Sequence, residues 1–115
     1  MYKNIKTYCD DHNVKLVAVS KTKPISSIQE LYTAGQRVFG ENRVQEMTEK
    51  YQQLPNDIEW HLIGHLQKNK VKYIAPFVSM IHSIDSLELL EIVNSQAKAN
   101  HRIIPVLLQF RIATE

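Results

Sequence analysis

Two patterns of apolar and polar residues alternate along this chain. Short, continuous apolar runs are typical of strands, and longer segments with an apolar residue every three or four positions are typical of amphipathic helices. The strand-like runs lie at 14–19, 37–39, 58–63, 78–84 and 103–110, and the helix-like segments at 1–12, 27–34, 43–53, 67–75 and 85–101. Because the strands begin about every 20 to 25 residues with a helix between them, the pattern predicts right-handed β-α-β units and an α/β fold with a parallel sheet.

Local signals sharpen several of these boundaries. Ser27 and Glu30 have the spacing of a capping box, as do Asp85 and Glu88, which predicts a helix start at each place. Gly35 follows the first of these helices and predicts its C-terminal cap. Pro105 favours a strand start or an edge strand in the last apolar run.

The stretch LVAVSKTKP, residues 16–24, ends the first predicted strand with two lysines. Its β-branched run predicts a strand buried on both faces, and Pro24 prevents that strand from continuing. Lys21 then lies at the carboxyl end of a parallel strand, where α/β folds bind their ligands. The charge of Lys23 disfavours protonation of Lys21 and suits it to attack a carbonyl carbon. The alternative is that Lys21 merely ends the strand in solvent.

Composition excludes several functional classes. The net charge of +2 is too small to indicate binding to nucleic acid or to an anionic membrane surface. No apolar run approaches the roughly 20 residues that span a bilayer, so a cytoplasmic location is the default. Cys9 is the only cysteine and is predicted to pack on a helix face. The histidines lack the spacing of metal ligands, so no metal is expected. The basic cluster at 67–72 is predicted to be a solvated helix face.

The number of strand–helix units leaves two alternatives for the architecture. A complete (β/α)8 barrel needs roughly 250 residues, and these 115 residues supply about half of its units. Either the strands form a small doubly wound sheet, or the chain is half of a barrel. An open half-barrel would expose an apolar inner face and unpaired strand edges, which predicts self-association.

Four segments that follow one another in order carry a resemblance to a known family. They are LVAVSKTKP (16–24), AGQRVFGENRVQE (34–46), EWHLIGHLQKNK (59–70) and IHSIDSLEL (81–89). Together they closely resemble the pyridoxal-phosphate homeostasis proteins, single-domain relatives of the alanine racemase barrel that are about twice as long. The resemblance implies that residues 1–115 form a single domain, the first half of a TIM (β/α)8 barrel of the alanine racemase N-terminal-domain type.

The same resemblance implies which residues bind pyridoxal phosphate. Lys21 matches the lysine that forms a Schiff base with the cofactor, and Lys23 matches the second lysine of that motif. Asn42 could donate a hydrogen bond near the ring hydroxyl, or it could be a helix N-cap. Gly64 could admit the flat ring closely, or it could permit an unusual turn.

His61 completes the predicted set of cofactor-binding residues. In a strand of period two, His61 and Ile63 face one side while Trp60 and Leu62 face the other. His61 is therefore either a site residue or a hydrogen-bonded core histidine. No catalytic residue is predicted.

The implied function is that of a carrier rather than an enzyme. Such a protein would hold pyridoxal phosphate as an exchangeable imine on Lys21 and supply it to apo-enzymes that depend on it. The alternative is an amino-acid racemase, such as an alanine racemase, with Lys21 as the base on one face of the substrate. That reaction needs a second acid–base group opposite the lysine, and Cys9 lies in the predicted first helix. Because the relatives bind the cofactor phosphate and ring nitrogen late in the barrel, we expect these 115 residues alone to bind the cofactor weakly.

Overall fold

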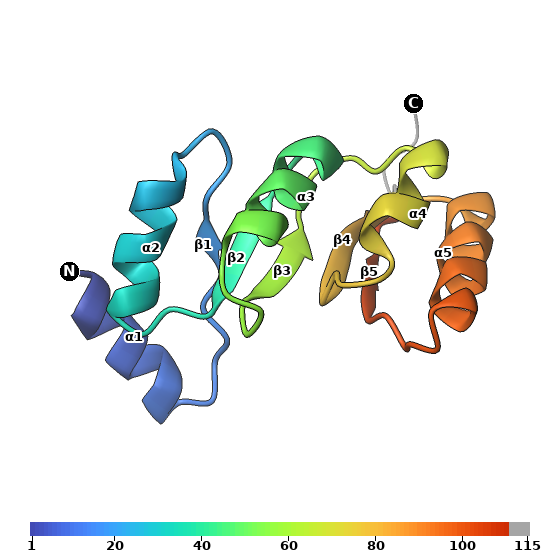
Figure 1. Cartoon of the computed structure of the whole chain (residues 1–115). Coiled ribbons are helices and arrows are strands. Elements are labelled where there is room, and N and C mark those ends of the chain that lie inside the picture. The colour runs from blue at the N-terminus through green and yellow to red at the C-terminus, as the bar shows by residue number, and fades with distance from the viewer. Residues whose placement is uncertain (111–115) are drawn as a thin grey trace.

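The computed structural model describes residues 1–110, which form a parallel five-stranded sheet with connecting helices (Figure 1). The strands are β1 (Ala18–Val19), β2 (Val38–Glu41), β3 (Glu59–Leu62), β4 (Met80–Ile84) and β5 (Val106–Leu108). The helices are α1 (Tyr2–Asp11), α2 (Ile25–Thr33), α3 (Val44–Gln53), the 3-10 turn η1 (Lys68–Lys70), α4 (Val71–Ile74) and α5 (Leu87–Ala99). The predicted alternation of strands and helices is confirmed.

The order of the strands decides between the two predicted architectures. The sheet runs β1-β2-β3-β4-β5, and each neighbouring pair is parallel. Right-handed connections between sequential strands place their helices on one face of the sheet, as in a barrel. A doubly wound sheet would instead reverse its strand order. The chain therefore has the arrangement of the first half of a (β/α)8 barrel, and the doubly wound alternative is wrong.

The hydrophobic core lies between the helices and one face of the sheet, here called the helix face. In register, the strand residues on this face are Ala18, Phe39, Trp60, Leu62, Ile81 and Val106. They pack in one cluster with residues of α2, α3, α4 and α5. The alternate residues form the opposite or inner face, where Val19 is 54% exposed and Leu107 is 48% exposed. The sheet is thus buried along the whole helix face, whereas its inner face is exposed at the two edge strands, β1 and β5.

This asymmetry corrects the prediction that the first strand is buried on both faces. Only Ala18 and Val19 pair with β2, and β1 forms the edge of the sheet. An apolar run of this kind is typical of a central strand, but its burial depends on elements that cover it from elsewhere. In residues 1–110, no such cover reaches Val19.

The helix boundaries confirm some local signals and correct others. Gly35 has φ +111° just after α2 and its N–H donates to the Tyr32 carbonyl, as predicted for a C-terminal cap. The predicted capping box at Ser27 is wrong, since α2 begins directly after Pro24 without a side-chain cap. The prediction at Asp85 is wrong by one residue. The Ser86 side chain caps α5 by accepting a hydrogen bond from the Leu89 N–H.

Other features agree with their sequence-based interpretation. Cys9 is buried on α1, and Lys68, Lys70 and Lys72 are exposed. Pro105 immediately precedes β5, which is the last strand of the described sheet. Within residues 1–110, no helix has the length and apolar character needed to cross a membrane.

Candidate ligand site at the carboxyl edge of the sheet

Lys21 lies where the chain leaves β1, in a tight turn. The Ser20 N–H donates to the Gly40 carbonyl at 2.9 Å, which continues the β1–β2 ladder to that point. The chain then turns back, and the Lys23 N–H donates to the Ser20 carbonyl at 3.1 Å. Both Lys21 and Lys23 are exposed. The prediction that Lys21 follows the first strand at the carboxyl edge of the sheet is therefore confirmed.

Thr22 gives this turn an uncommon backbone conformation. Its φ is +61°, in the left-handed region that a β-branched residue seldom adopts. Its hydroxyl donates to the Lys21 carbonyl at 2.6 Å, and its N–H donates to a Glu46 carboxylate oxygen at 2.7 Å. These contacts compensate a conformation that costs free energy by itself.

Asn42 and Gly64 lie at the same edge, after β2 and β3. A Cβ atom on Gly64 would lie 2.7 Å from the Asn42 carbonyl oxygen and 2.9 Å from its Cα. Gly64 is therefore required by the close approach of two backbone segments. Its φ is not positive, so the alternative in which it permits an unusual turn is wrong. Asn42 is not the N-cap of α3 either, because that position is Arg43.

His61 lies within β3, one residue before the strand ends at Leu62, and its ring contacts that of His82 on β4. In the β2–β3 register it is aligned with Gly40, on the inner face, and it is only 3% exposed. Its Nδ1 lies 2.9 Å from His82 Nε2, so one of these nitrogens carries a proton that the other accepts. Burial lowers the pKa of His61 to about 4, with the charge of His82 as a second cause. Burial also lowers the pKa of His82. Both rings are therefore neutral near pH 7.

The hydrogen-bonded interpretation of His61 is thus confirmed, with a partner that sequence reasoning missed. His82 had no signal of its own, because the pair depends on how β3 and β4 align. A second link joins the same strands, where the Ser83 hydroxyl donates to the Gly64 carbonyl. These contacts fix the ends of β3 and β4 relative to each other beside Asn42.

A buried ion network lies behind the Lys21 turn, on the helix face. Lys50 of α3 is 5% exposed and Glu41 of β2 is fully buried. The Lys50 ammonium lies 2.8 Å from a Glu41 carboxylate oxygen and 2.7 Å from a Glu46 oxygen. It also donates to the Ser20 carbonyl at 2.8 Å, and the Ser20 hydroxyl donates to the same Glu41 oxygen. Sequence reasoning missed this network because lysine and glutamate are almost never fully buried unless they are paired.

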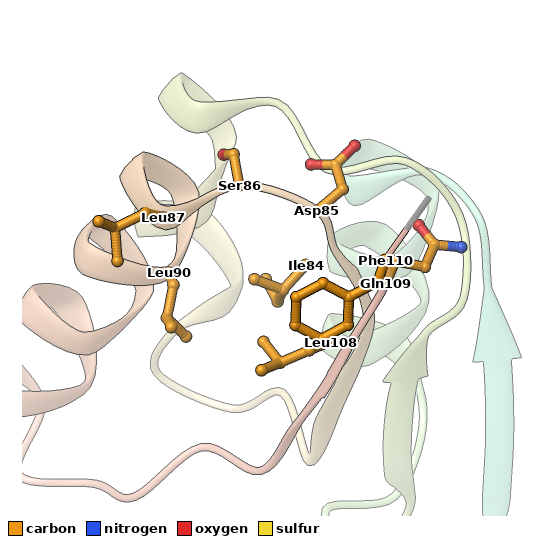
Figure 2. A pocket seen from close by; sticks show the side chains of 8 residues that line it. All are labelled: Ile84, Asp85, Ser86, Leu87, Leu90, Leu108, Gln109 and Phe110. Carbon is orange, nitrogen blue, oxygen red and sulfur yellow. The ribbon is translucent and has the colours of Figure 1, made fainter. Parts of the chain in front are cut away.

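An open apolar pocket of about 300 Å³ lies between α5 and β5. Figure 2 shows Ile84, Leu90, Leu108 and Phe110 gathered around it. The side chains of Asp85 and Gln109 point away from this group in the same view. The pocket therefore offers hydrocarbon surface and no cluster of polar groups, unlike the edge that carries Lys21.

Fold and site together define a class: a half-barrel of sequential parallel strands with an exposed lysine at the carboxyl end of its first strand. A family model described as "Alanine racemase, N-terminal domain" matches residues 1–113, and the chain belongs to this family. The fold class inferred from the resemblance is thereby confirmed. The family explains why the helices cover one face of the sheet, since in a barrel the other face lines the interior.

Curated relatives and solved structures agree with this assignment. The pyridoxal phosphate homeostasis protein of Haemophilus influenzae is 42% identical over an alignment of 119 residues, gaps included. The alignment covers 96% of this chain and 50% of that protein. The protein of the same name from Escherichia coli K12 is 44% identical over 106 residues, covering 89% of this chain and 45% of its own length. The chain thus spans about half the length of the curated relatives it matches.

Two solved structures of PipY from Synechococcus elongatus PCC7942 share this fold. The structure without pyridoxal phosphate has a TM-score of 0.82 and 42% identity, and covers 89% of this chain and 48% of PipY. The structure with pyridoxal phosphate bound has a TM-score of 0.80 and 43% identity, and covers 89% of this chain and 49% of PipY.

Proposed function

We propose that this chain is part of a protein that binds pyridoxal phosphate as a Schiff base on Lys21 and serves in its intracellular homeostasis. The observation that carries the proposal is the place of Lys21, an exposed amine at the carboxyl edge beside the Asn42–Gly64 contact. The names of the curated relatives and the bound cofactor in PipY support the choice of ligand.

The residues at this edge suit the chemical groups of pyridoxal phosphate. The cofactor supplies an electrophilic aldehyde carbon, and a lysine amine condenses with it through a new C–N double bond and loss of water. The Asn42 amide is a donor for the ring hydroxyl. Gly64 lets the backbone that carries Asn42 lie close to the end of β3, which places that amide at the same edge as Lys21. The neutral His61–His82 pair adds hydrogen-bonding capacity without charge.

Lys23 has a separate role in this proposal. It lies two residues from Lys21 in the same turn and is likewise exposed, so its positive charge acts on the reaction of the Lys21 amine with the cofactor. Lys23→Ala should therefore bind pyridoxal phosphate more weakly and more slowly than the unaltered chain. Lys72→Ala, which removes an exposed lysine from α4, is the matched control. Equal affinity and equal rate in Lys23→Ala would disprove this role.

The proposal is tested by reducing the imine with borohydride and measuring how much cofactor stays attached to the chain. We expect the 115 residues alone to bind weakly, so borohydride is added to a mixture with pyridoxal phosphate, because reduction accumulates even a sparsely populated imine. The cofactor should become attached to the chain, and this attachment should fall to background in Lys21→Ala. It should persist in Lys68→Ala, a matched change of an exposed lysine. Undiminished attachment in Lys21→Ala would refute the proposal.

The homeostasis role adds a transfer step. The loaded protein should restore the activity of an apo-enzyme that depends on pyridoxal phosphate, at a rate set by release from Lys21. The measurement compares this rate with that given by the same concentration of free cofactor. The racemase alternative is tested by alanine racemisation, and a turnover in the ordinary enzymatic range of about 1 to 1,000 per second would favour it. The position of Cys9, buried on α1, gives that alternative no support.

The open inner face leads to a proposal about assembly. Val19 and Leu107, on the two edge strands, present apolar surface on the inner face. We expect two copies to associate through this face. Sedimentation should show a mass that increases with protein concentration, and a single monomeric species at high concentration would contradict the expectation. Cytoplasmic residence and single-domain organisation over 1–115 stay predictions.

A further inference from the structure

The ion network behind Lys21 holds the backbone on both sides of that residue. On one side, the Lys50 ammonium of α3 donates to the carbonyl of Ser20 at 2.8 Å. On the other side, a Glu46 oxygen accepts from the N–H of Thr22 at 2.7 Å. Lys50 and Glu46 are themselves paired at 2.7 Å. One turn of α3 therefore contacts the residue before Lys21 and the residue after it.

The anchor of this arrangement lies on the neighbouring strand. Glu41 of β2 is fully buried, and its carboxylate holds Lys50 at 2.8 Å. A buried ion pair is weak evidence for stability, because apolar residues of similar volume often stabilise a fold as well or better. The charged side chains instead orient the backbone. They form hydrogen bonds with the Ser20 carbonyl and the Thr22 N–H group, which no apolar side chain could do.

The backbone conformation of Thr22 explains why these hydrogen bonds are needed. Its φ of +61° lies in a region that a β-branched residue leaves readily unless its surroundings oppose this. Relaxation at Thr22 would rotate the peptide that joins it to Lys21. The direction of the Lys21 side chain would change with that rotation.

We propose that Lys50 and Glu46 are positioning residues for the Lys21 amine. The proposal rests on the proposed function of Lys21 and extends it to a pair of residues on α3. Neither residue touches the cofactor in this account. They act through the Ser20 carbonyl and the Thr22 N–H, so that the amine meets the aldehyde in one geometry instead of many.

The test uses Glu46 rather than Lys50. Removing Lys50 would leave Glu41 buried without its partner, and the whole fold would be expected to suffer. Glu46→Ala removes the acceptor for Thr22 at a more accessible position, where the side chain is 25% exposed. Glu49→Ala is the matched control, an exposed glutamate of the same helix. Glu46→Gln keeps an acceptor oxygen without the charge. Circular dichroism establishes that each variant is folded.

The first measurement needs no cofactor. Amide hydrogen exchange at Thr22 should become roughly tenfold faster in Glu46→Ala, because its hydrogen bond to a charged group is lost. Glu46→Gln should lie between Glu46→Ala and the unaltered chain, and Glu49→Ala should leave the rate unchanged. An unchanged rate in Glu46→Ala would overturn the proposal, since the Thr22 backbone would then be held by other contacts.

The second measurement follows the rate at which borohydride attaches pyridoxal phosphate to Lys21 and to Lys23. Glu46→Ala should slow attachment at Lys21 severalfold and change Lys23 less, and Glu46→Gln should restore part of the rate. Equal rates at Lys21 in Glu46→Ala and in the unaltered chain would overturn the positioning role alone. If the unaltered chain is not modified at Lys21, the proposed function fails and the positioning role fails with it.

Discussion

The two faces of the sheet differ in what holds them and in what they offer to a ligand. On the helix face, Phe39, Leu62 and Ile81 are completely buried in a continuous core. On the inner face, Val19 and Leu107 of the edge strands are about half exposed, and the polar pair His61–His82, in which His61 is buried, lies on the strands between them. The contrast teaches that the helix face carries the stability of this half-barrel. The inner face and its carboxyl edge remain open for a ligand or for further protein.

The largest difference is expected between two leucines on opposite faces. Leu62→Ala on the helix face should lower the free energy of unfolding by about 2–5 kcal/mol, through lost burial and the cavity that remains. Leu107→Ala on the inner face should cost less than about 1 kcal/mol, since its side chain is already half exposed. Urea denaturation followed by circular dichroism measures both. Equal losses would mean that the inner face is also packed.

The second prediction concerns pH and the buried histidine of the inner face. The pKa of His61 is lowered to about 4 in the folded state from an ordinary value of 6.5. Above pH 6.5 the ring is neutral in both states. Between pH 6.5 and 4 only the unfolded chain takes up this proton, so the free energy of unfolding falls as the pH falls, by up to about 3 kcal/mol. Denaturation midpoints across this range give the slope.

Variants isolate the histidine responsible for this slope. His61→Gln should remove most of the dependence between pH 6.5 and 4.5, before most carboxylates titrate, and a smaller part should remain from His82, whose pKa burial also lowers. His65→Gln, which changes an exposed histidine three residues after β3, should leave it intact. An undiminished slope in His61→Gln would show that another group is responsible.

A smaller effect is expected from glycines at the strand ends. Gly64→Ala would place a Cβ 2.7 Å from the Asn42 backbone, which cannot move without displacing the end of β2. We expect a loss of about 1–3 kcal/mol in the free energy of unfolding. In Gly40→Ala the nearest atoms to the new Cβ belong to the side chains of Val17 and Ile63, at 3.1 Å and beyond, so its cost should be lower. Thermal unfolding of the two variants side by side checks the order, and the reverse order would contradict the close approach at Asn42.

The smallest effect is expected where a hydroxyl replaces a methyl group on the open face. Val19→Thr should change the free energy of unfolding by less than about 0.5 kcal/mol, because the side chain is 54% exposed. The same change at Val78, which is completely buried in the core, should cost about 1–3 kcal/mol through a desolvated hydroxyl. The comparison is made at a protein concentration at which sedimentation shows a monomer, and a large loss in Val19→Thr there would show that this face is covered within the chain itself.

Local information predicted much of the fold. Strand positions, the parallel sheet and the place of Lys21 after β1 follow from apolar runs and from the proline that ends the turn. The burial of Val19 was predicted wrongly, because burial depends on elements that the run itself does not specify. The helix cap at Ser86 was predicted one residue early, since Asp85 is an equally suitable capping residue.

The parts of the site that escaped prediction all depend on contacts between elements. In the sequence, Lys50 and Glu41 are typical of a solvated surface. Only the packing of α3 against β2 brings the two side chains together in the interior. His82 becomes the partner of His61 only through the alignment of β3 with β4. A glycine at position 64 is compatible with several roles. The structure shows that its role is to allow the close approach of the Asn42 backbone.

The central claim is that one particular lysine is the amine that takes up pyridoxal phosphate. Peptide mapping by mass spectrometry, after brief exposure to the cofactor and reduction with borohydride, identifies the modified residue directly. The account predicts that the peptide carrying Lys21 is modified first and to the greatest extent. Equal modification spread over the exposed lysines, with Lys68 or Lys72 as reactive as Lys21, would contradict it.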